Sequence, residues 1–290
     1  MRWYRGMNAS RPHVRHNCGV MRTRCILFLV FLKEKGDNVD RTSFFSQFRF
    51  DSALAGAYGI EREFFLSDEE GMPVPRSPEF LARMNDSAWT YELSACQVEH
   101  RTSPEYALAR IMASLQASHE SAIAVAQAMG ARLIALEVAP VNMSLDVYPH
   151  DERYQLLAKQ LPCETLRAAC RVAGIHIHHG AKNLEDAIRI HNVVVDRLED
   201  FIRMGDHSNG ERMRLYQNMA TNWKPPRYES AEHLYTVARE QGFASNPRDC
   251  WHLVRISRHG TVELRMFGMT AELSRIAHWI GALGEVVANR

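Results

Sequence analysis

Four short segments of this chain alternate polar, metal-binding side chains at a period of two. They are Glu61-Arg62-Glu63, Gln97-Val98-Glu99, His176-Ile177-His178 and Glu263-Leu264-Arg265. In a β-strand alternate side chains share a face, so each segment turns its polar pair to one side and the intervening residue to the other. The pattern predicts one sheet with an inner face packed on a core and an open face that carries carboxylates, imidazoles and a guanidinium.

The polar pairs on this predicted face are suited to cations and phosphates. Clustered carboxylates repel one another, and burying them as ions is costly unless they are paired or metal-bound. Mg²⁺ and Mn²⁺ prefer such oxygen ligands, and an arginine among them provides a fork for phosphate or a substrate carboxylate. Taken singly, each segment also fits a solvated strand, a core histidine pair or a cross-strand ion pair. The metal prediction depends on all four occurring together. A zinc hydrolase is disfavoured, because the chain has no HExxH motif and no cysteine cluster.

The rest of the chain mixes strands and helices without strict alternation. Strands are expected near residues 57–66, 89–93, 95–101, 132–138 and 170–180, with a hairpin at 253–256 and 261–266. Helices are expected from Ser103 to Gly130, over 152–160, from Asn183 to Gly205 and over 272–287, whereas 206–247 has little periodicity and is expected to be a functional loop or lid. The predicted class is α+β: a mostly antiparallel, twisted sheet with helices packed on one face, leaving the other face accessible.

Composition limits the possible partners and compartment. The formal net charge of +1 gives no reason to expect nucleic acid. Six scattered cysteines resemble neither a disulfide framework nor a zinc ribbon, which indicates a reducing, cytoplasmic setting. Five tryptophans and thirteen methionines leave room for a homo-oligomer interface without locating one.

The first residues differ from the rest. Residues 1–24 carry six arginines and no acid, and residues 25–32 (CILFLVFL) are apolar but too short to span a bilayer. A weak secretory signal is the alternative, although no small-residue cleavage site follows. We expect residues 1–45 to be a basic, poorly ordered extension, with a start codon assigned too early as one origin, and residues 46–290 to form the catalytic domain. No membrane association is expected.

Longer blocks around the four segments resemble a known family. The blocks are GIEREFFLSDEEGMPVP (59–75), ELSACQVEHRTSP (92–104), GIHIHHG (174–180) and TVELRMF (261–267). They resemble successive parts of the glutamate–cysteine ligase type 2, or carboxylate–amine ligase, family, in the family's order and over roughly residues 55–285. That family belongs to the glutamine synthetase-like superfamily, whose sheet is shared by guanidino kinase catalytic domains. The resemblance implies a funnel-shaped antiparallel sheet that admits ATP at one end and carries two or three divalent ions.

The resemblance also implies a reaction and its residues. ATP would phosphorylate the γ-carboxylate of glutamate or a similar acid, and an amine would displace phosphate from the acyl phosphate to form an amide. The implied ligands for Mg²⁺ (or Mn²⁺) are Glu61, Glu63, Glu92, Glu99, His176 and Glu263. Glu263 and Arg265 are the implied catalytic residues, with Arg265 contacting phosphate or the acid substrate. His178, Arg212 and Arg214 are the implied nucleotide-binding residues.

Departures from the family pattern keep other functions open. LYQNMATNWKPPRY (215–228) resembles the related amidoligase branch, and His179 replaces a small apolar residue before Gly180. Family members also continue with further helices after the Glu-Leu-Arg strand. One alternative is a shortened, non-catalytic relative that binds nucleotide–metal or a protein partner. The other, ranked last, is a phosphotransferase of the guanidino-kinase type.

Overall fold

The computed structural model describes residues 39–289. Its strands are β1 (Tyr58–Ser67), β2 (Trp89–Tyr91), β3 (Gln97–Arg101), β4 (Arg132–Ile134), β5 (Gly174–Gly180), β6 (Val254–Ile256) and β7 (Thr261–Gly268). Its α-helices are α1 (Arg41–Phe45), α2 (Ser77–Met84), α3 (Leu108–Ala128), α4 (Glu152–Gln160), α5 (Cys163–Arg171), α6 (Leu184–Val195), α7 (Leu198–Gly205), α8 (Glu211–Met219), α9 (Ala231–Glu240) and α10 (Leu273–Ala288). Two short 3₁₀ turns, η2 (Ser52–Leu54) and η3 (Pro247–Asp249), complete the described elements.

The strands form one antiparallel sheet in the order β2-β3-β1-β5-β7-β6, with β4 paired to the end of β1. The predicted α+β class and antiparallel sheet are confirmed. All four polar segments lie on the adjacent strands β3, β1, β5 and β7. Their register places Glu63 opposite Glu99 and Glu61 opposite His176. The sheet therefore assembles four sequence-distant segments into one surface.

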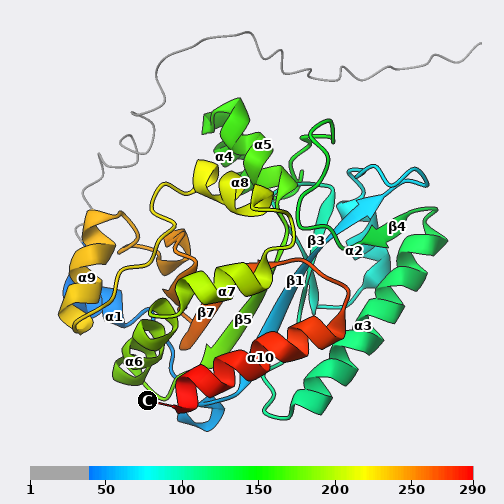
Figure 1. Cartoon of the computed structure of the whole chain (residues 1–290). Helices are drawn as coiled ribbons and strands as arrows, with labels where there is room; N and C mark the ends of the chain where they lie inside the picture. Colours follow the sequence, from blue (N-terminus) through cyan, green and yellow to red (C-terminus); the bar gives the residue numbers. More distant parts are fainter. Residues whose placement is uncertain (1–38, 290) are drawn as a thin grey trace, which may run out of the picture. The chain divides into compact units, whose positions relative to one another are not determined.

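Helices α3, α6, α7 and α10 cover the opposite face (Figure 1). Arg62, between the two glutamates of β1, is fully buried there and donates from Nη2 to the Leu115 carbonyl of α3 at 2.9 Å. Near the end of β7, the ring of Phe267 stacks on Trp279 of α10 and meets Phe201 of α7 edge-on. These apolar and cation contacts fix the helices to the sheet and leave the polar side chains on the other side.

A β-bulge interrupts the β5–β7 pairing where the polar face ends. Ile177 pairs with Leu264 and Ile175 with Phe267, so β7 has one residue more than β5 in this interval. Such an extra residue reverses the inside–outside alternation beyond it. Phe267 is thereby directed into the helix-side core, whereas Glu263 and Arg265 line the polar face.

Several helix boundaries differ from the sequence expectation. α3 begins at Leu108 instead of near Ser103, because Glu105 is held extended in a bridge to Tyr58. The helix expected from Asn183 to Gly205 is two helices, α6 and α7, separated at 196–197. The segment 206–247 contains α8 and α9 instead of an irregular lid, and α5 extends to Arg171, so the strand expected from residue 170 begins at Gly174.

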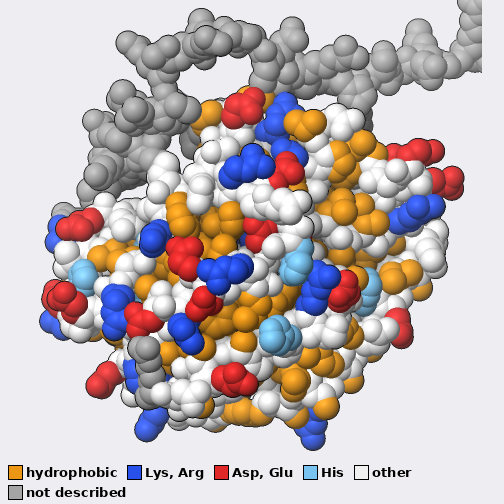
Figure 2. Space-filling model, in the orientation of Figure 1, with side chains coloured by type: hydrophobic (Ala, Val, Ile, Leu, Met, Phe, Trp, Pro, Cys, Tyr) orange, Lys and Arg blue, Asp and Glu red, His pale blue; other side chains and the backbone are white. Residues whose placement is uncertain are grey.

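Phe44 shows that the packed body begins before residue 46. Its side chain is fully buried and packs edge-on against Phe48, so α1 belongs to the domain and not to an extension. The remainder of the proposed extension, residues 1–38, lies outside the described residues. On the face shown in Figure 2, acidic and basic side chains are intermixed among apolar ones. No helix within residues 39–289 is both long and apolar enough to cross a bilayer.

Candidate functional site

A cavity of about 400 Å³ lies over the polar face of the sheet. Its floor is formed by side chains of β3, β1, β5 and β7, and its walls by α4, the end of α5, α8 and the segment around η3. Helices therefore border the polar face as well, where they leave a hollow between them instead of closing it. The hollow is large enough for a small-molecule substrate.

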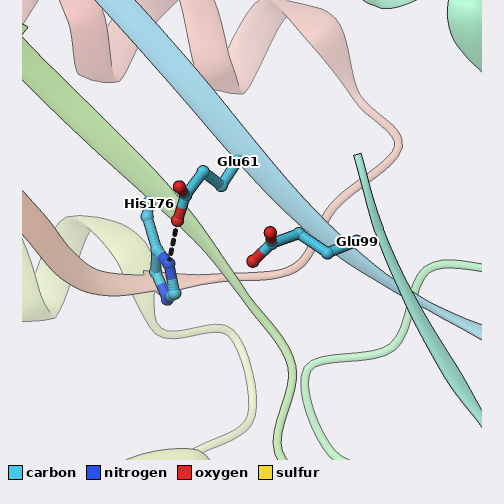
Figure 3. A group of neighbouring side chains, drawn as sticks. All are labelled: Glu61, Glu99 and His176. Atoms are coloured by element: carbon cyan, nitrogen blue, oxygen red, sulfur yellow. Dashed lines mark hydrogen bonds and ion pairs between the residues drawn. The ribbon is translucent and has the colours of Figure 1, made fainter. Parts of the chain in front are cut away.

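Glu61, Glu99 and His176 form one potential cation site in this floor. They come from β1, β3 and β5, and Figure 3 shows their side chains converging from three strands. His176 Nδ1 lies 3.0 Å from Glu61 Oε2, and its Nε2 lies 3.6 Å from Glu63 Oε1. One potential ligand atom from each of the three residues lies within 4.8 Å of the other two. The group offers the two carboxylates and one imidazole expected of a mixed oxygen–nitrogen site.

Glu61, His178 and Glu263 form a second potential cation site, in which the potential ligand atoms again lie within 4.8 Å of one another. His178 Nε2 lies 3.4 Å from Glu61 Oε1, and its Nδ1 is 2.8 Å from the Thr261 hydroxyl. Burial acts to lower the pKa of His178, but the charges of Glu61 and Glu263 outweigh it and raise the pKa. Likewise burial acts to raise the pKa of Glu61, and the two histidines hold it well below its ordinary value.

Glu263 is the most completely enclosed acid of the site, with 1% of its side chain exposed. Arg255 donates from Nε to Oε2 at 2.7 Å, and Arg265 donates from Nη1 to Oε1 at 2.6 Å. Although burial opposes ionisation, these two guanidinium groups lower the pKa of Glu263 far below its ordinary value. Arg265 Nε also donates to the Tyr216 hydroxyl at 3.3 Å. This network fixes Glu263 as an anion and orients Arg265 toward the cavity.

Glu63, Glu92 and Glu99 form the third group, in which basic partners such as Arg101 only partly offset burial and mutual repulsion. Burial, followed by repulsion from Glu61 and Glu92, raises the pKa of Glu99 well above its ordinary value. Burial also raises the pKa of Glu92 and of Glu63. Three carboxylates that resist ionisation together need additional positive charge, and a divalent cation with oxygen preference supplies it. The donor set therefore fits Mg²⁺ or Mn²⁺ at this end of the floor.

Most of the site residues predicted from the sequence lie in the cavity. Those that line the cavity together are Glu61, Glu63, Glu92, Glu99, His176, His178, Arg212, Glu263 and Arg265. Arg212 is buried, and its three nitrogens donate to the carbonyls of Ala173, Met266 and Arg265. It thus secures the β5–β7 bulge as well as lining the site. Arg214 is exposed on α8 and lies outside the cavity lining.

Several lining residues were not anticipated from the sequence, among them Arg255, Tyr216 and Tyr154. Arg255 alternates with Val254 and Ile256 in the predicted hairpin, so the same period-two reasoning applied to β6 would have found it. Tyr216 and Tyr154 come from α8 and α4, whose positions over the sheet depend on tertiary packing. Tyr154 lines the cavity together with the third carboxylate group, and the charge of Glu92, followed by burial and Glu99, raises its pKa.

Comparison with known proteins assigns the family. A model of glutamate-cysteine ligase family 2 (GCS2) matches residues 57–283, most of the chain. The chain belongs to this family. The match includes all four polar segments and the whole carboxylate floor, so family membership and the geometry of the site concern the same residues. The resemblance inferred from the sequence is confirmed.

Individual relatives are distant. A glutamate–cysteine ligase of Natronomonas pharaonis is 24% identical over 229 residues, which are 72% of this chain and 63% of that protein. A glutamate–cysteine ligase of Halobacterium salinarum is 24% identical over 234 residues, 73% of this chain and 64% of that protein. The chain thus spans just under two thirds of the length of these two relatives.

A solved structure shares the fold. The chain is similar to a bifunctional glutathione synthetase from Pasteurella multocida with a TM-score of 0.53 and 14% sequence identity, over 82% of this chain and 40% of that one. At this identity the similarity concerns the fold alone. It supports the antiparallel sheet architecture independently of the local residue pattern.

Proposed function

We propose that this protein is an ATP-dependent carboxylate–amine ligase that forms an amide of the γ-glutamyl type through an acyl phosphate. The observation that carries the proposal is the convergence of Glu61, Glu99, His176 and Glu263 in one cavity, beside an arginine fork on Glu263. Membership of the glutamate–cysteine ligase family supports a carbon–nitrogen ligase. Carboxylates that hold cations beside arginines are the arrangement that phosphoryl transfer requires.

The side chains divide the work of the reaction by their charge. The carboxylate groups on β1, β3 and β7 would hold Mg²⁺, which when bound supplies positive charge to the triphosphate. Arg265 is held by Glu263 and Tyr216, so its guanidinium meets a developing phosphoryl charge without first having to reorient. Arg255, fixed on the other oxygen of Glu263, adds a second cation on the β6 side.

The proposed reaction has two steps. A carboxylate oxygen of the acid substrate bonds to the γ-phosphorus while the bond to the ADP oxygen breaks, giving an acyl phosphate. The neutral amine nitrogen then bonds to the acyl carbon, the carbon–oxygen bond to phosphate breaks, phosphate leaves with that electron pair, and the amine proton passes to solvent. The walls leave the floor little exposed, with Glu263 1% and Glu99 8% exposed, which would slow hydrolysis of the intermediate by water.

Amine-dependent ADP release tests the proposal. Full-length protein with ATP, Mg²⁺, glutamate and a panel of amines is expected to release ADP, and hydroxylamine is expected to trap a glutamyl hydroxamate. Both signals should vanish with EDTA. Nucleotide binding in calorimetry without ADP release under any of these conditions would overturn the ligase function in favour of a non-catalytic nucleotide–metal binding protein.

A conservative variant tests the role of Arg265. Arg265→Lys retains the charge but loses the fork to Glu263 and Tyr216, so we expect ADP release to fall by about 100-fold or more. Arg203→Lys is the matched control, because Arg203 is a surface residue that pairs only with Asp200 of its own helix among the described ion pairs. Equal activity of the two variants would remove Arg265 from the proposed machinery.

A further inference from the structure

The side chains that line the cavity differ between the two ends of the β6–β7 hairpin. Arg265 N–H donates to the Leu253 carbonyl at one end of the hairpin, and Ser257 N–H donates to the Thr261 carbonyl at the other. The four residue-to-residue steps from Thr261 to Arg265 span about 13 Å at the usual strand rise. Glu263 lies midway, so the carboxylate floor separates two ends with different chemistry.

The end near the hairpin turn is basic and open. Arg258 and His259 lie in the turn, and Arg248 of η3 lines the same cavity. The positive charge of Arg248, with burial and Arg49 as smaller causes, lowers the pKa of Arg258, so these guanidinium groups lie close enough to repel one another. An exposed group of like-charged guanidiniums beside a carboxylate floor suits the phosphates of a nucleotide.

The other end carries a group of apolar side chains beside polar lining residues such as Gln97, Tyr154 and Arg212. The members of the apolar group are Leu157 of α4, Ala169 and Val172 at the end of α5, Tyr216 and Met219 of α8, and Trp251. Packing of α5 on α8 and two hydrogen bonds hold them together: Tyr216 Oη donates to the Trp251 carbonyl at 3.1 Å, and Gln97 Nε2 donates to the Val172 carbonyl at 2.7 Å. Apolar side chains in this number are not needed to bind cations, phosphate or a carboxylate.

The order of groups in a nucleotide decides which substrate meets this apolar end. If the γ-phosphate lies over the carboxylate floor and the other phosphates extend toward Arg258, the adenine lies beyond them, away from Met219 and Trp251. The apolar end then remains for the second substrate. We propose that it binds the substituent of the acceptor amine, and that the preferred acceptor is a primary amine with an aliphatic or aromatic substituent instead of cysteine.

This inference rests on the proposed ligase function and is tested by an amine series. With ATP, Mg²⁺ and glutamate, phenethylamine and isoamylamine are expected to have kcat/KM values about tenfold or more above those of ethanolamine and cysteine. The reason is that each methylene buried in an apolar pocket raises kcat/KM by about tenfold or more. Higher kcat/KM for cysteine or ethanolamine would overturn the inference while leaving the ligase function intact.

A variant pair separates an amine site from an adenine site. Met219→Gln places a polar amide of similar length in the apolar wall, and we expect it to raise the KM for phenethylamine at least fivefold with the KM for ATP within twofold. Gln217→Ala, an exposed position on the same helix, is the matched control and should change neither. A rise in the KM for ATP alone would show that the wall holds adenine and would overturn the inference.

If no ADP release is seen, the binding of phenethylamine tests the proposed amine site directly. Calorimetric titration of phenethylamine into the protein with Mg²⁺ and ADP is expected to give a signal that Met219→Gln weakens at least fivefold. That result without ADP release would retain the amine site and reject the ligase function. Absence of phenethylamine binding would overturn the amine site itself.

Discussion

Replacing Glu99 by glutamine tests whether the carboxylate floor is built for cations. Glu99 is 8% exposed and belongs to two of the three potential cation sites, with Glu61 in one and Glu63 and Glu92 in the other. Glutamine has nearly the same shape but no charge. We expect Glu99→Gln to be more stable than the unaltered protein without metal, and to lose much of its stabilisation by Mg²⁺.

The magnitude follows from the spacing of the charges. Two carboxylates no more than 4.8 Å apart repel by at least about 3 kcal/mol at an effective dielectric constant of about 20. Arg101 Nε, 3.7 Å from Glu99 Oε1, offsets part of this repulsion. Allowing for this, we expect a net gain of about 2 kcal/mol in the free energy of unfolding, which corresponds to a Tm higher by about 4 °C.

The expected increase in the free energy of unfolding agrees with the raised pKa of Glu99. Burial and neighbouring carboxylates raise the folded-state pKa of Glu99, so ionisation at pH 8 favours the unfolded chain. Glutamine removes that cost. A cation provides the same relief by binding, and at 100 times its Kd it stabilises the folded state by about 2.7 kcal/mol.

Thermal unfolding at pH 8 with EDTA, and again with increasing MgCl₂, measures both effects. Glu69→Gln, at an exposed turn position, is the matched control and should leave the Tm and its dependence on Mg²⁺ unchanged. The reasoning is refuted if Glu99→Gln lowers the Tm in EDTA, because native contacts would then favour the charge. It is also refuted if the variant responds to Mg²⁺ as strongly as the unaltered protein.

Two further predictions concern buried groups outside the carboxylate floor. Burial lowers the pKa of His191 to about 4, so its contribution to stability is present above the unfolded-state pKa near 6.5 and is lost as pH falls toward 4. When pH falls from 7.5 to 5, the free energy of unfolding of His191→Phe should therefore decrease by about 2 kcal/mol less than that of the unaltered protein, as measured by urea unfolding. An identical pH dependence of the two proteins would contradict this. A Cβ at Gly174 would lie 2.3 Å from Arg212 Nη2 and 2.9 Å from the Phe267 carbonyl oxygen. Gly174→Ala should therefore lower the free energy of unfolding by about 1–3 kcal/mol, as measured by urea unfolding. An unchanged free energy of unfolding would show that the bulge and Arg212 can shift freely.

Period-two patterning was sufficient to predict the strands β1, β3, β5 and β7 and the polar side chains that they contribute to the floor. Alternation in Glu61-Arg62-Glu63 and His176-Ile177-His178 requires each polar pair to share a face, whatever the rest of the fold. The joint occurrence of four such segments predicted that their polar groups gather on one sheet, and the register of β3, β1, β5 and β7 confirms it. The antiparallel α+β class was predictable for the same reason, because one face had to remain open.

The sequence by itself determined which side chains belong to the floor, since strand alternation is a local property of the backbone. Only the tertiary structure decided which groups surround it. Tyr154, Met219 and Trp251 reach the cavity because α4, α8 and the segment around η3 pack above the sheet, and no local period encodes that approach. Arg214 illustrates the converse: it lies two residues from Arg212 on α8, and the 100° step per residue of a helix turns it to solvent while Arg212 is buried at the bulge.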